Sequence, residues 1–348
     1  MSTRPLVSIG IVTYNSENEI RYCLESIHSQ TYEPLEVVVI DNASKDRTVS
    51  LIRSSGIAVQ LSSNERNLGF AAAQNQAIRL TRGDYYLALN PDVVMAPDFV
   101  AELVECFTLH AGVGTASGKL LRPAREDSSP LLDSTGIYMS PNLRHLDRGS
   151  GQIDVGQYDR PQFVFGASGA AALYARSMLD DVALDGEFFD EDFFAYREDA
   201  DLAWRAQLRG WKALYTPRAV AFHSRRVLPE RRRSLPSEIN MHSVKNRFLL
   251  RIKNQTPYEF VTLFFPSLFR DLQVLGYVLL FERTSLPGLF FVARNFRRTW
   301  GKRRQIMSRR RTKGRDMLRW FRRQPVAFEM NIEEESKSAA LKTMTASG

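Results

Sequence analysis

Short apolar runs alternate with helical patterns along the first part of the chain. The runs at residues 6–13, 36–40 and 85–89 are rich in aliphatic and aromatic side chains, which predicts buried strands, and a shorter strand is expected near Val59. Helices are expected between them, at about 16–30, 46–54, 71–80 and 97–110. Strands that alternate with helices build a parallel sheet through βαβ units. The pattern therefore predicts an α/β fold with a mostly parallel central sheet flanked by helices.

Polar side chains directly follow the first two predicted strands. Thr13, Tyr14 and Asn15 come after the first strand, and Asp41 and Asn42 come after the second. Ligands of open α/β sheets bind at the carboxyl ends of the strands, so this arrangement is typical of a nucleotide pocket. The sequence has no Gly-x-Gly-x-x-Gly after the first strand and no Gly-Lys-Ser/Thr phosphate loop. Bound phosphates would therefore need a metal ion or basic side chains.

Asp92 lies just beyond the strand at 85–89, which Asn90-Pro91 ends because proline has no N–H for a sheet ladder. A carboxylate at this edge can hold Mg²⁺, which uses one or two carboxylates together with substrate phosphates. The alternative is a turn residue that only caps the following helix. The local sequence leaves both interpretations open.

The middle of the chain changes character. Residues 122–161 are polar and weakly periodic, which predicts loops crossing the surface near a site. Residues 163–172 are mostly small and include Ser168 and Gly169. Glycine permits close approach of the backbone to a ligand, but the same pattern also fits a tightly packed strand.

Glu198 and Asp199 begin a predicted helix that runs to Arg209, with Gly210 directly after its end. Carboxylates in a first turn can simply complement the helix dipole. Alternatively, one of them is a general base in a cleft lined by aromatic residues, where partial burial raises the pKa of a carboxyl group. His223 ends the second of two predicted strands, at 211–215 and 219–222, and is either structural or a ligand.

The charge is concentrated near the C-terminus. Residues 297–323 contain thirteen Arg or Lys and one Asp, a local charge of +12, whereas the whole chain of 348 residues carries +8. The remainder is therefore slightly acidic, at −4. The two cysteines, Cys23 and Cys106, fall in predicted helices, so we expect no disulfide framework and a reducing compartment.

Five motifs occur in order over roughly residues 5–250: VSIGIVTYN at 7–15, VIDNASKD at 39–46, NLGF at 67–70, LNPD at 89–92, and EDADL at 198–202 with Arg205. Together they resemble the inverting family 2 glycosyltransferases, which have the GT-A (nucleotide-diphospho-sugar transferase) fold. The resemblance is to the bacterial rhamnosyltransferase-like branch, which builds cell-surface polysaccharides.

The resemblance implies roles for individual residues. The residues that would bind the donor nucleotide are Thr13, Tyr14, Asn15, Asp41, Asn67, Gly69 and Asn90. Asp92 and His223 would hold a divalent metal ion, Mg²⁺ or Mn²⁺. Asp199 would be the catalytic base, with Glu198 beside it. The candidates for acceptor or phosphate contacts are Ser168, Gly169, Arg205, Arg225 and Arg226. Asn90 departs from the Asp-x-Asp of the family, so an amide oxygen replaces a carboxylate and the metal should bind less tightly.

The implied reaction is transfer of a sugar, with inversion, from a nucleotide-sugar donor to a hydroxyl group of a polyprenyl-diphosphate-linked saccharide. The resemblance favours rhamnose from dTDP-rhamnose, with a UDP-hexose as the alternative donor. It also implies a cytoplasmic enzyme, peripheral on the cytoplasmic face of the inner membrane.

The C-terminal third contains two uncharged apolar runs, 260–269 and 272–281, separated by Arg270-Asp271. Each is shorter than the roughly 20 residues that span a bilayer. We expect amphipathic helices in the membrane interface, with the basic run against anionic headgroups. The alternative is a second packed helical subdomain. The expected organisation is a transferase domain at 1–225, with a donor half to about 95 and an acceptor half after it, then a helical basic region at 226–325 and a disordered tail at 326–348.

Three other functions fit parts of the sequence. A nucleotidyltransferase would also need a nucleotide pocket, but it leaves Glu198 and Asp199 unexplained. A nucleic-acid-binding protein would use the basic run, which lacks a recognisable recognition fold. An inactive scaffold would not need Asp41, Asp92 and Asp199 together.

Overall fold

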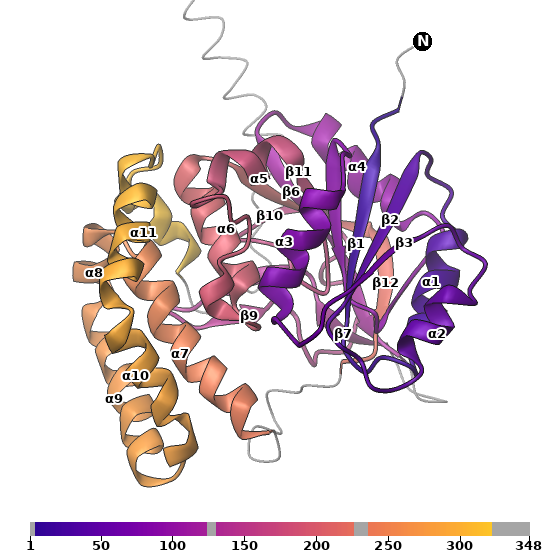
Figure 1. Ribbon diagram of the computed structural model, residues 1–348. Helices are drawn as coiled ribbons and strands as arrows, with labels where there is room; N and C mark the ends of the chain where they lie inside the picture. The colour runs from indigo at the N-terminus through magenta and orange to yellow at the C-terminus, as the bar shows by residue number, and fades with distance from the viewer. Residues whose placement is uncertain (1–3, 124–129, 226–235, 322–348) are drawn as a thin grey trace, which may run out of the picture.

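The computed structural model describes residues 4–123, 130–225 and 236–321 (Figure 1). The first elements are β1 Val7–Thr13, α1 Ile20–His28, β2 Leu35–Asp41, α2 Thr48–Arg53, β3 Gln60–Ser63, α3 Phe70–Leu80, β4 Tyr85–Leu89, β5 Val93–Met95 and α4 Phe99–Leu109. The next are β6 Val113–Arg122, β7 Leu131–Ser134, β8 Ile137–Met139, β9 His145–Asp147, β10 Gln162–Val164, β11 Ala171–Ala175, α5 Arg176–Val182, η1 Glu191–Phe193, α6 Glu198–Arg209 and β12 Lys212–His223. The C-terminal elements are α7 Ser237–Asn254, α8 Pro257–Thr262, α9 Phe264–Leu280, η3 Arg283–Ser285, α10 Leu286–Arg294, α11 Phe296–Ser308, α12 Gly314–Met317 and η4 Leu318–Trp320.

The central sheet has the order β10-β12-β6-β11-β4-β1-β2-β3, with β5 paired to β12 and β7 paired to β6. Its first half, β4-β1-β2-β3, is parallel as the sequence predicts. The second half is mixed, because β11 runs antiparallel to both β4 and β6 while β12 is parallel to β6. Turns rather than a crossover helix precede β11, and a parallel strand would need such a crossover. The predicted α/β fold, with a central sheet flanked by helices, is therefore confirmed, and the second half of the sheet adds antiparallel pairs to the parallel ones.

Two apolar layers cover the sheet. On one face, Ile9 and Ile11 of β1 pack with side chains of α1 and α4, including Leu24 and Phe99. On the other face, Val12 packs with side chains of α3, α5 and α6. Every residue of β1 is buried, as expected for a strand covered on both faces. The sheet is thus a rigid platform whose carboxyl edge carries the loops.

Several predicted boundaries needed correction. The two strands expected at 211–215 and 219–222 are one strand, β12, with a register shift between Tyr215 and Val220, around Pro217. Proline cannot donate to the ladder, so the pattern is interrupted there although the strand continues. Residues 122–161 contain the short strands β7, β8 and β9 in addition to loops.

The C-terminal helices pack against α6 (Figure 1). Trp204 and Leu208 of α6 contact a buried cluster that includes Leu249 and Leu250 of α7 and Ile306 of α11. Helix α7, from Ser237 to Asn254, buries ten of its side chains in this packing. On its packed side, this region therefore matches the alternative of a second helical subdomain.

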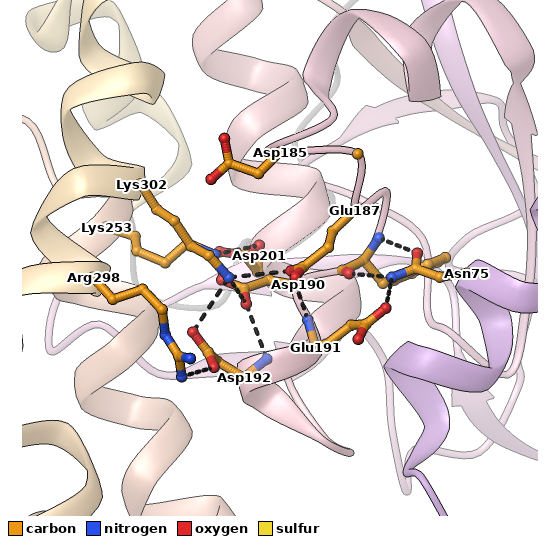
Figure 2. Close-up of polar contacts among 12 residues, drawn as sticks. Asn75, Asp185, Glu187, Asp190, Glu191, Asp192, Asp201, Lys253, Arg298 and Lys302 are labelled. Atoms are coloured by element: carbon orange, nitrogen blue, oxygen red, sulfur yellow. Dashed lines mark hydrogen bonds and ion pairs between the residues drawn. The ribbon is translucent and has the colours of Figure 1, made fainter. Parts of the chain in front are cut away.

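A buried ion-pair cluster of Asp190, Asp201, Lys253 and Lys302 joins this helical layer to the sheet domain (Figure 2). Lys253 of α7 pairs with Asp190 and lies 2.9 Å from Asp201 of α6. Lys302 of α11 lies 2.6 Å from Asp190. Burial by itself lowers the pKa of Lys302, but the nearby carboxylates outweigh burial and raise this pKa. Asp190, Asp192 and Asp201 therefore anchor the C-terminal helices. Glu191 instead accepts from the side chain of Asn75 in α3.

Arg270 and Asp271 do not separate two helices, because both lie within α9. Asp271 is compensated by ion pairs with Arg247 and Arg251 of α7. Across the described residues, no individual helix has the length and apolarity to cross a bilayer. Helix α9 and the segment Arg283–Arg294 meet these criteria only when taken together, with a bend of 111° between them.

Candidate active site at the carboxyl edge of the sheet

The ends of β1 and β2 are joined by side-chain hydrogen bonds. The hydroxyl group of Thr13 donates to Oδ1 of Asp41 at 2.8 Å. Ser44 donates to the same carboxylate from its hydroxyl group and from its backbone N–H, at 2.6 and 3.0 Å. Asp41 is buried, and its hydrogen bond to Thr13 fixes the position of both side chains. Both side chains also carry polar groups that a ligand could contact.

The Asn67-Gly69 loop lies beside this edge. The amide of Asn42 donates to the carbonyl of Gly69 at 3.1 Å, and the side chain of Asn67 accepts from the N–H of Gly69 at 2.9 Å. Gly69 has a φ of +89°, a conformation that favours glycine. Tyr14 is half exposed at the rim. The predicted nucleotide-binding residues of β1, β2 and this loop are therefore close together in space.

Asp92 and His223 meet at the next strand ends. Strand β5 pairs with β12, with Val93 opposite His223, so the register brings Asp92 to the end of β12. Nε2 of His223 lies 3.4 Å from Oδ1 of Asp92, and Nδ1 lies 2.7 Å from Oδ2 of Asp133. Burial alone would lower the pKa of His223, but Asp133 and Asp92 outweigh it and raise the pKa to about 9. Asp92 therefore lies against the imidazole of His223 in addition to its place in the turn after β4.

Asp133 and Asp147 are two functional candidates that sequence reasoning missed. Asp133 is fully buried and also faces Arg225, with Nη1 3.6 Å from Oδ1. Arg225 pairs with Asp147 at 2.6 Å. Both carboxylates lie in the weakly periodic stretch at 122–161, where nothing in the local sequence predicts which strand end they reach. Their partners lie far along the chain: His223, at the end of β12, is 90 residues after Asp133, and Arg225, just beyond β12, is 78 residues after Asp147.

Asp199 lies at the start of α6 with both carboxylate oxygens fixed. Oδ2 accepts from the N–H of Gly169 at 3.0 Å, and Oδ1 accepts from the N–H of Ala200 at 2.7 Å. Burial raises the pKa of Asp199, and these backbone hydrogen bonds oppose the rise only in part. Arg225 is among the charges that act on Asp199. This places the metal-candidate pair and the candidate base in one electrostatic network.

Glu198 is buried beside Asp199. Burial and the charge of Asp199 raise its pKa well above the usual range, which favours the neutral form. Its Oε2 atom is buried and has no hydrogen-bond partner among the residues described. The two carboxyl groups therefore lie in different environments: backbone N–H groups hold both oxygens of Asp199, whereas this oxygen of Glu198 has no such partner. Such a difference allows neighbouring carboxyl groups to have different roles.

Arg205 does not belong to the site, and its proposed contact with acceptor or phosphate is wrong. It is buried, pairs with Asp201 at 2.9 Å, and donates to the carbonyls of Val182 and Phe188. A guanidinium group saturated in this way holds α6 to the preceding loop. Its position one helical turn after Asp201 accounts for the pairing.

The remaining predicted residues have mixed outcomes. Gly169 is at the site through its N–H, while Ser168 beside it is buried. The N–H of Asn90 donates to the carbonyl of Ala170 at 2.8 Å, which ties β4 to the turn before β11. Asn15 has a φ of +51° and accepts from the N–H of Lys45 through its side chain. The prediction for Arg226 lies outside the described residues.

The donor set at Asp92 and His223 fits a divalent cation. One carboxylate oxygen and one imidazole nitrogen face the same point, and Asp133 orients the imidazole through its other nitrogen, as carboxylates commonly do behind metal-bound histidine. Among the residues described, no group of three or more His, Cys, Asp or Glu side chains is arranged to hold a metal ion. The site therefore suits a metal ion whose other ligands come from a diphosphate and water.

Comparisons with known proteins find similar glycosyltransferases. Residues 8–123 match the model of glycosyl transferase family 2. A poly-beta-1,6-N-acetyl-D-glucosamine synthase of Staphylococcus aureus is 26% identical over 225 residues, which cover 62% of this chain and 49% of that protein. An uncharacterized glycosyltransferase of Haemophilus influenzae is 30% identical over 153 residues, 42% of this chain and 47% of that protein. The chain thus spans about half the length of the curated relatives that it matches.

Solved structures share the fold at low sequence identity. The mannosyltransferase PcManGT from Pyrobaculum calidifontis, in complex with GDP-Man and Mn²⁺, superposes with a TM-score of 0.50 at 19% identity, covering 88% of this chain and 86% of that one. S. aureus TarS superposes with a TM-score of 0.53 at 16% identity, covering 87% of this chain and 52% of that one. Residues 8–123 therefore match the family 2 glycosyltransferases, and the chain shares the GT-A fold of these solved structures.

Proposed function

We propose that this chain transfers a sugar, with inversion, from a nucleotide-sugar donor to a hydroxyl group, and that Asp199 is the general base. The observation that carries the proposal is the fixed carboxylate of Asp199, held by the N–H groups of Gly169 and Ala200. Burial raises the pKa of Asp199 above its usual value, which makes its carboxylate a better proton acceptor. A base needs both this geometry and this basicity.

The proposed reaction is a single displacement. The acceptor hydroxyl oxygen forms a bond to the anomeric carbon, its proton passes to Asp199, and the bond from that carbon to the diphosphate oxygen breaks. Attack on the face opposite the leaving group inverts the anomeric centre. Arg225 lies 3.6 Å from Asp133, the partner of His223, so its positive charge would help to stabilise the diphosphate as it becomes more negative.

Asp92 and His223 would hold a divalent cation, Mg²⁺ or Mn²⁺, at the strand ends. Such an ion, when bound, would stabilise the growing negative charge of the leaving diphosphate. Asn90 supplies an amide where the family has a carboxylate, so we propose weak metal binding that strengthens when the donor is present.

The donor pocket is proposed to lie between the ends of β1 and β2 and the Asn67-Gly69 loop. Half-exposed Tyr14 is available to a base or ribose there. The motif resemblance favours dTDP-rhamnose as the donor, and a UDP-hexose is the alternative. The Staphylococcus relative is named as a synthase of an N-acetyl-D-glucosamine polymer. This name supports including UDP-hexoses in the donor screen.

The acceptor is proposed to be a polyprenyl-diphosphate-linked saccharide at the cytoplasmic face of the inner membrane. The C-terminal helices expose large apolar side chains that a soluble subdomain would normally bury. The exposed set comprises Tyr258, Phe260, Val261, Phe264, Phe265, Leu268, Phe269, Leu272, Leu279, Leu280, Phe281, Phe290, Phe296 and Trp300. Exposed Arg283, Arg294 and Arg297 flank this apolar surface, which suits a bilayer with anionic headgroups.

The placement of this surface also favours a membrane-bound acceptor. In Figure 1 the turn between α9 and α10 lies at the lower end of the helical layer, the end towards which β1 runs from the N-terminus. The carboxyl edge of the sheet and this apolar turn thus face the same side of the molecule. We propose that residues up to 225 perform transfer while the C-terminal helices hold the site against the bilayer.

A donor screen tests the proposal. Purified protein is incubated with dTDP-rhamnose, UDP-glucose, UDP-N-acetylglucosamine or GDP-mannose, with and without Mn²⁺, and the thermal midpoint and the release of nucleoside diphosphate are measured. We expect one nucleotide class to stabilise the protein in Mn²⁺, and Asp92→Asn to lose most of this effect. Asp98→Asn, at an exposed residue before α4, is the matched control. Absence of any stabilisation or release with metal present would contradict the proposal.

A further inference from the structure

The segment that leads into α6 has an unusual backbone. Phe194, Tyr196 and Arg197 have φ values of +65°, +70° and +71°. Left-handed backbone is uncommon for residues other than glycine, and a bulky residue adopts it only where surrounding contacts enforce it. Arg197 is followed directly by Glu198 and Asp199. Whatever holds this turn therefore also sets the position of the two carboxyl groups.

Asn246 of α7 provides that restraint. Its side-chain amide nitrogen donates to the backbone carbonyls of Phe193, Ala195 and Tyr196 at 2.9, 2.8 and 2.7 Å. Asn246 is fully buried, and its two amide hydrogens are shared among three carbonyls that have turned away from helical hydrogen bonding. One side chain from the C-terminal helical layer thus bonds three carbonyls of the turn. Lys245, beside it on α7, also donates to the carbonyl of Phe193, at 3.4 Å.

Phe194 connects the same turn to the donor loop. Its ring stacks on His242 of α7, with centroids 4.6 Å apart and planes within 4°. Its carbonyl accepts from the N–H of Ala71 at 3.1 Å, and a Cβ added at Gly69 would lie 2.6 Å from the ring. The turn is therefore packed between α7 and the loop that we propose binds the donor.

We propose that Asn246 is a positioning residue that holds the 193–197 turn so that Asp199 faces the donor pocket. The C-terminal helices are then part of the catalytic assembly in addition to being a membrane-facing layer. This inference rests on the proposed role of Asp199 as the base. Asn246 acts through the backbone of the turn and need not touch substrate.

Asn254 offers a matched control on the same helix. It is as fully buried as Asn246, and its amide donates to Asp201 and to the carbonyl of Leu250, away from the turn. Asn246→Ala and Asn254→Ala remove the same atoms from α7, so both are expected to lower the thermal midpoint. Asn246→Ser keeps one hydroxyl donor and serves as a milder variant if Asn246→Ala does not fold.

The first readout is independent of activity. Hydrogen–deuterium exchange, followed by mass spectrometry, is measured for peptides that cover residues 193–201 of the full chain. We expect at least tenfold faster exchange in this segment for Asn246→Ala, a smaller increase for Asn246→Ser, and little change for Asn254→Ala. Equal exchange in the wild type and both Asn246 variants would overturn the inference, whether or not the protein transfers a sugar.

The second readout links the turn to the reaction. With the donor identified by the screen, we expect Asn246→Ala to lower kcat by about ten- to a hundredfold, Asn246→Ser to recover part of it, and Asn254→Ala to stay within about twofold of the wild type. The donor KM of Asn254→Ala should also be unchanged. An equal loss of kcat in the two alanine variants would overturn the inference, because it would mean that Asn246 contributes only to the stability of α7. A wild type without transfer activity would instead contradict the proposed function, while the exchange result would still test the restraint.

Discussion

The carboxylate of Asp199 and the backbone N–H of Gly169 form a 3.0 Å hydrogen bond that links the start of α6 to the turn before β11. A Cβ added at Gly169 would lie 3.3 Å from the Cβ of Asp199, so the absence of a side chain lets the two backbones approach. The small residues at 163–172 therefore match both alternatives in the sequence analysis, a tightly packed strand and a close approach of the backbone. They continue into the packed strand β11, and they approach a functional group closely.

Gly169→Ala should displace Asp199 by a few tenths of an ångström. We expect kcat to fall about tenfold, because positioning of a base within about half an ångström matters for proton transfer, while affinity for nucleoside diphosphate stays within about threefold. Steady-state kinetics and calorimetric titration measure the two effects. Gly301→Ala in α11 is the control, since a Cβ there meets no atom within 4 Å. Unchanged kcat in Gly169→Ala would argue against a close fit at Asp199.

The charge of His223 should make stability depend on pH. Its pKa is about 9 in the fold, against about 6.5 for an unperturbed histidine. Because the folded pKa is the higher one, its contribution of roughly 3 kcal/mol is complete below about pH 6.5 and is lost as the pH rises through 9. Urea unfolding of metal-free wild type and His223→Gln between pH 6 and 10 measures it. We expect the difference between the two proteins to shrink over that range, and a constant difference would contradict the assignment.

Lys253 should be critical for the attachment of the helical layer. Replacing it by methionine leaves Asp190 and Asp201 without one of their buried cations, and loss of one partner from a buried pair costs about 3–5 kcal/mol. The free energy of unfolding in urea measures this loss. The exposed pair of Arg315 and Asp316 gives the comparison, since Arg315→Met should change stability by less than about 1 kcal/mol. Similar losses in the two variants would mean that the buried cluster contributes no more than a surface pair.

The apolar turn after α9 should contribute to membrane binding. Leu280 and Phe281 are 70% and 75% exposed, and transfer of such a side chain into an apolar phase is worth about 1.5–3 kcal/mol. We expect Leu280→Ser with Phe281→Ser to weaken flotation with anionic vesicles at least tenfold. Val155→Ser, at another highly exposed apolar residue on the sheet domain, should float like the wild type. Undiminished flotation of the double variant would contradict membrane contact by this turn.

Local pattern predicted the parallel half of the sheet and the polar strand ends because both depend on short stretches of sequence. The alternation of β1, α1 and β2 is visible in their own residues, and so are Asp41 and Asp92 at the strand ends. The mixed half depends on how distant strands pair, and the pairing of β11 with β4 is not encoded in either segment alone. The partners Asp133 and Asp147 were missed for the same reason.

The carboxylates between 187 and 201 show where pattern reasoning was insufficient. Asp190 and Asp201 are buried, unlike carboxylates on a solvated face. Their cationic partners, Lys253 and Lys302, lie fifty or more residues away, within segments that were expected to face a membrane. Both Asp199 and Asp201 lie in the first turn of α6, so their spacing alone does not show that Asp199 contacts Gly169 whereas Asp201 binds α7.

The central claim is that Asp199 accepts the proton of the acceptor. In Asp199→Asn the side chain keeps its size but can no longer accept that proton, so we expect transfer to fall at least a hundredfold while affinity for the nucleoside diphosphate stays within about threefold. Asp180→Asn, at an exposed residue of α5, is the control and should retain full transfer. The measurement is single-turnover formation of the glycosylated acceptor at saturating donor. Near-normal turnover in Asp199→Asn would contradict the account, whereas retained binding with lost transfer is the result that it predicts.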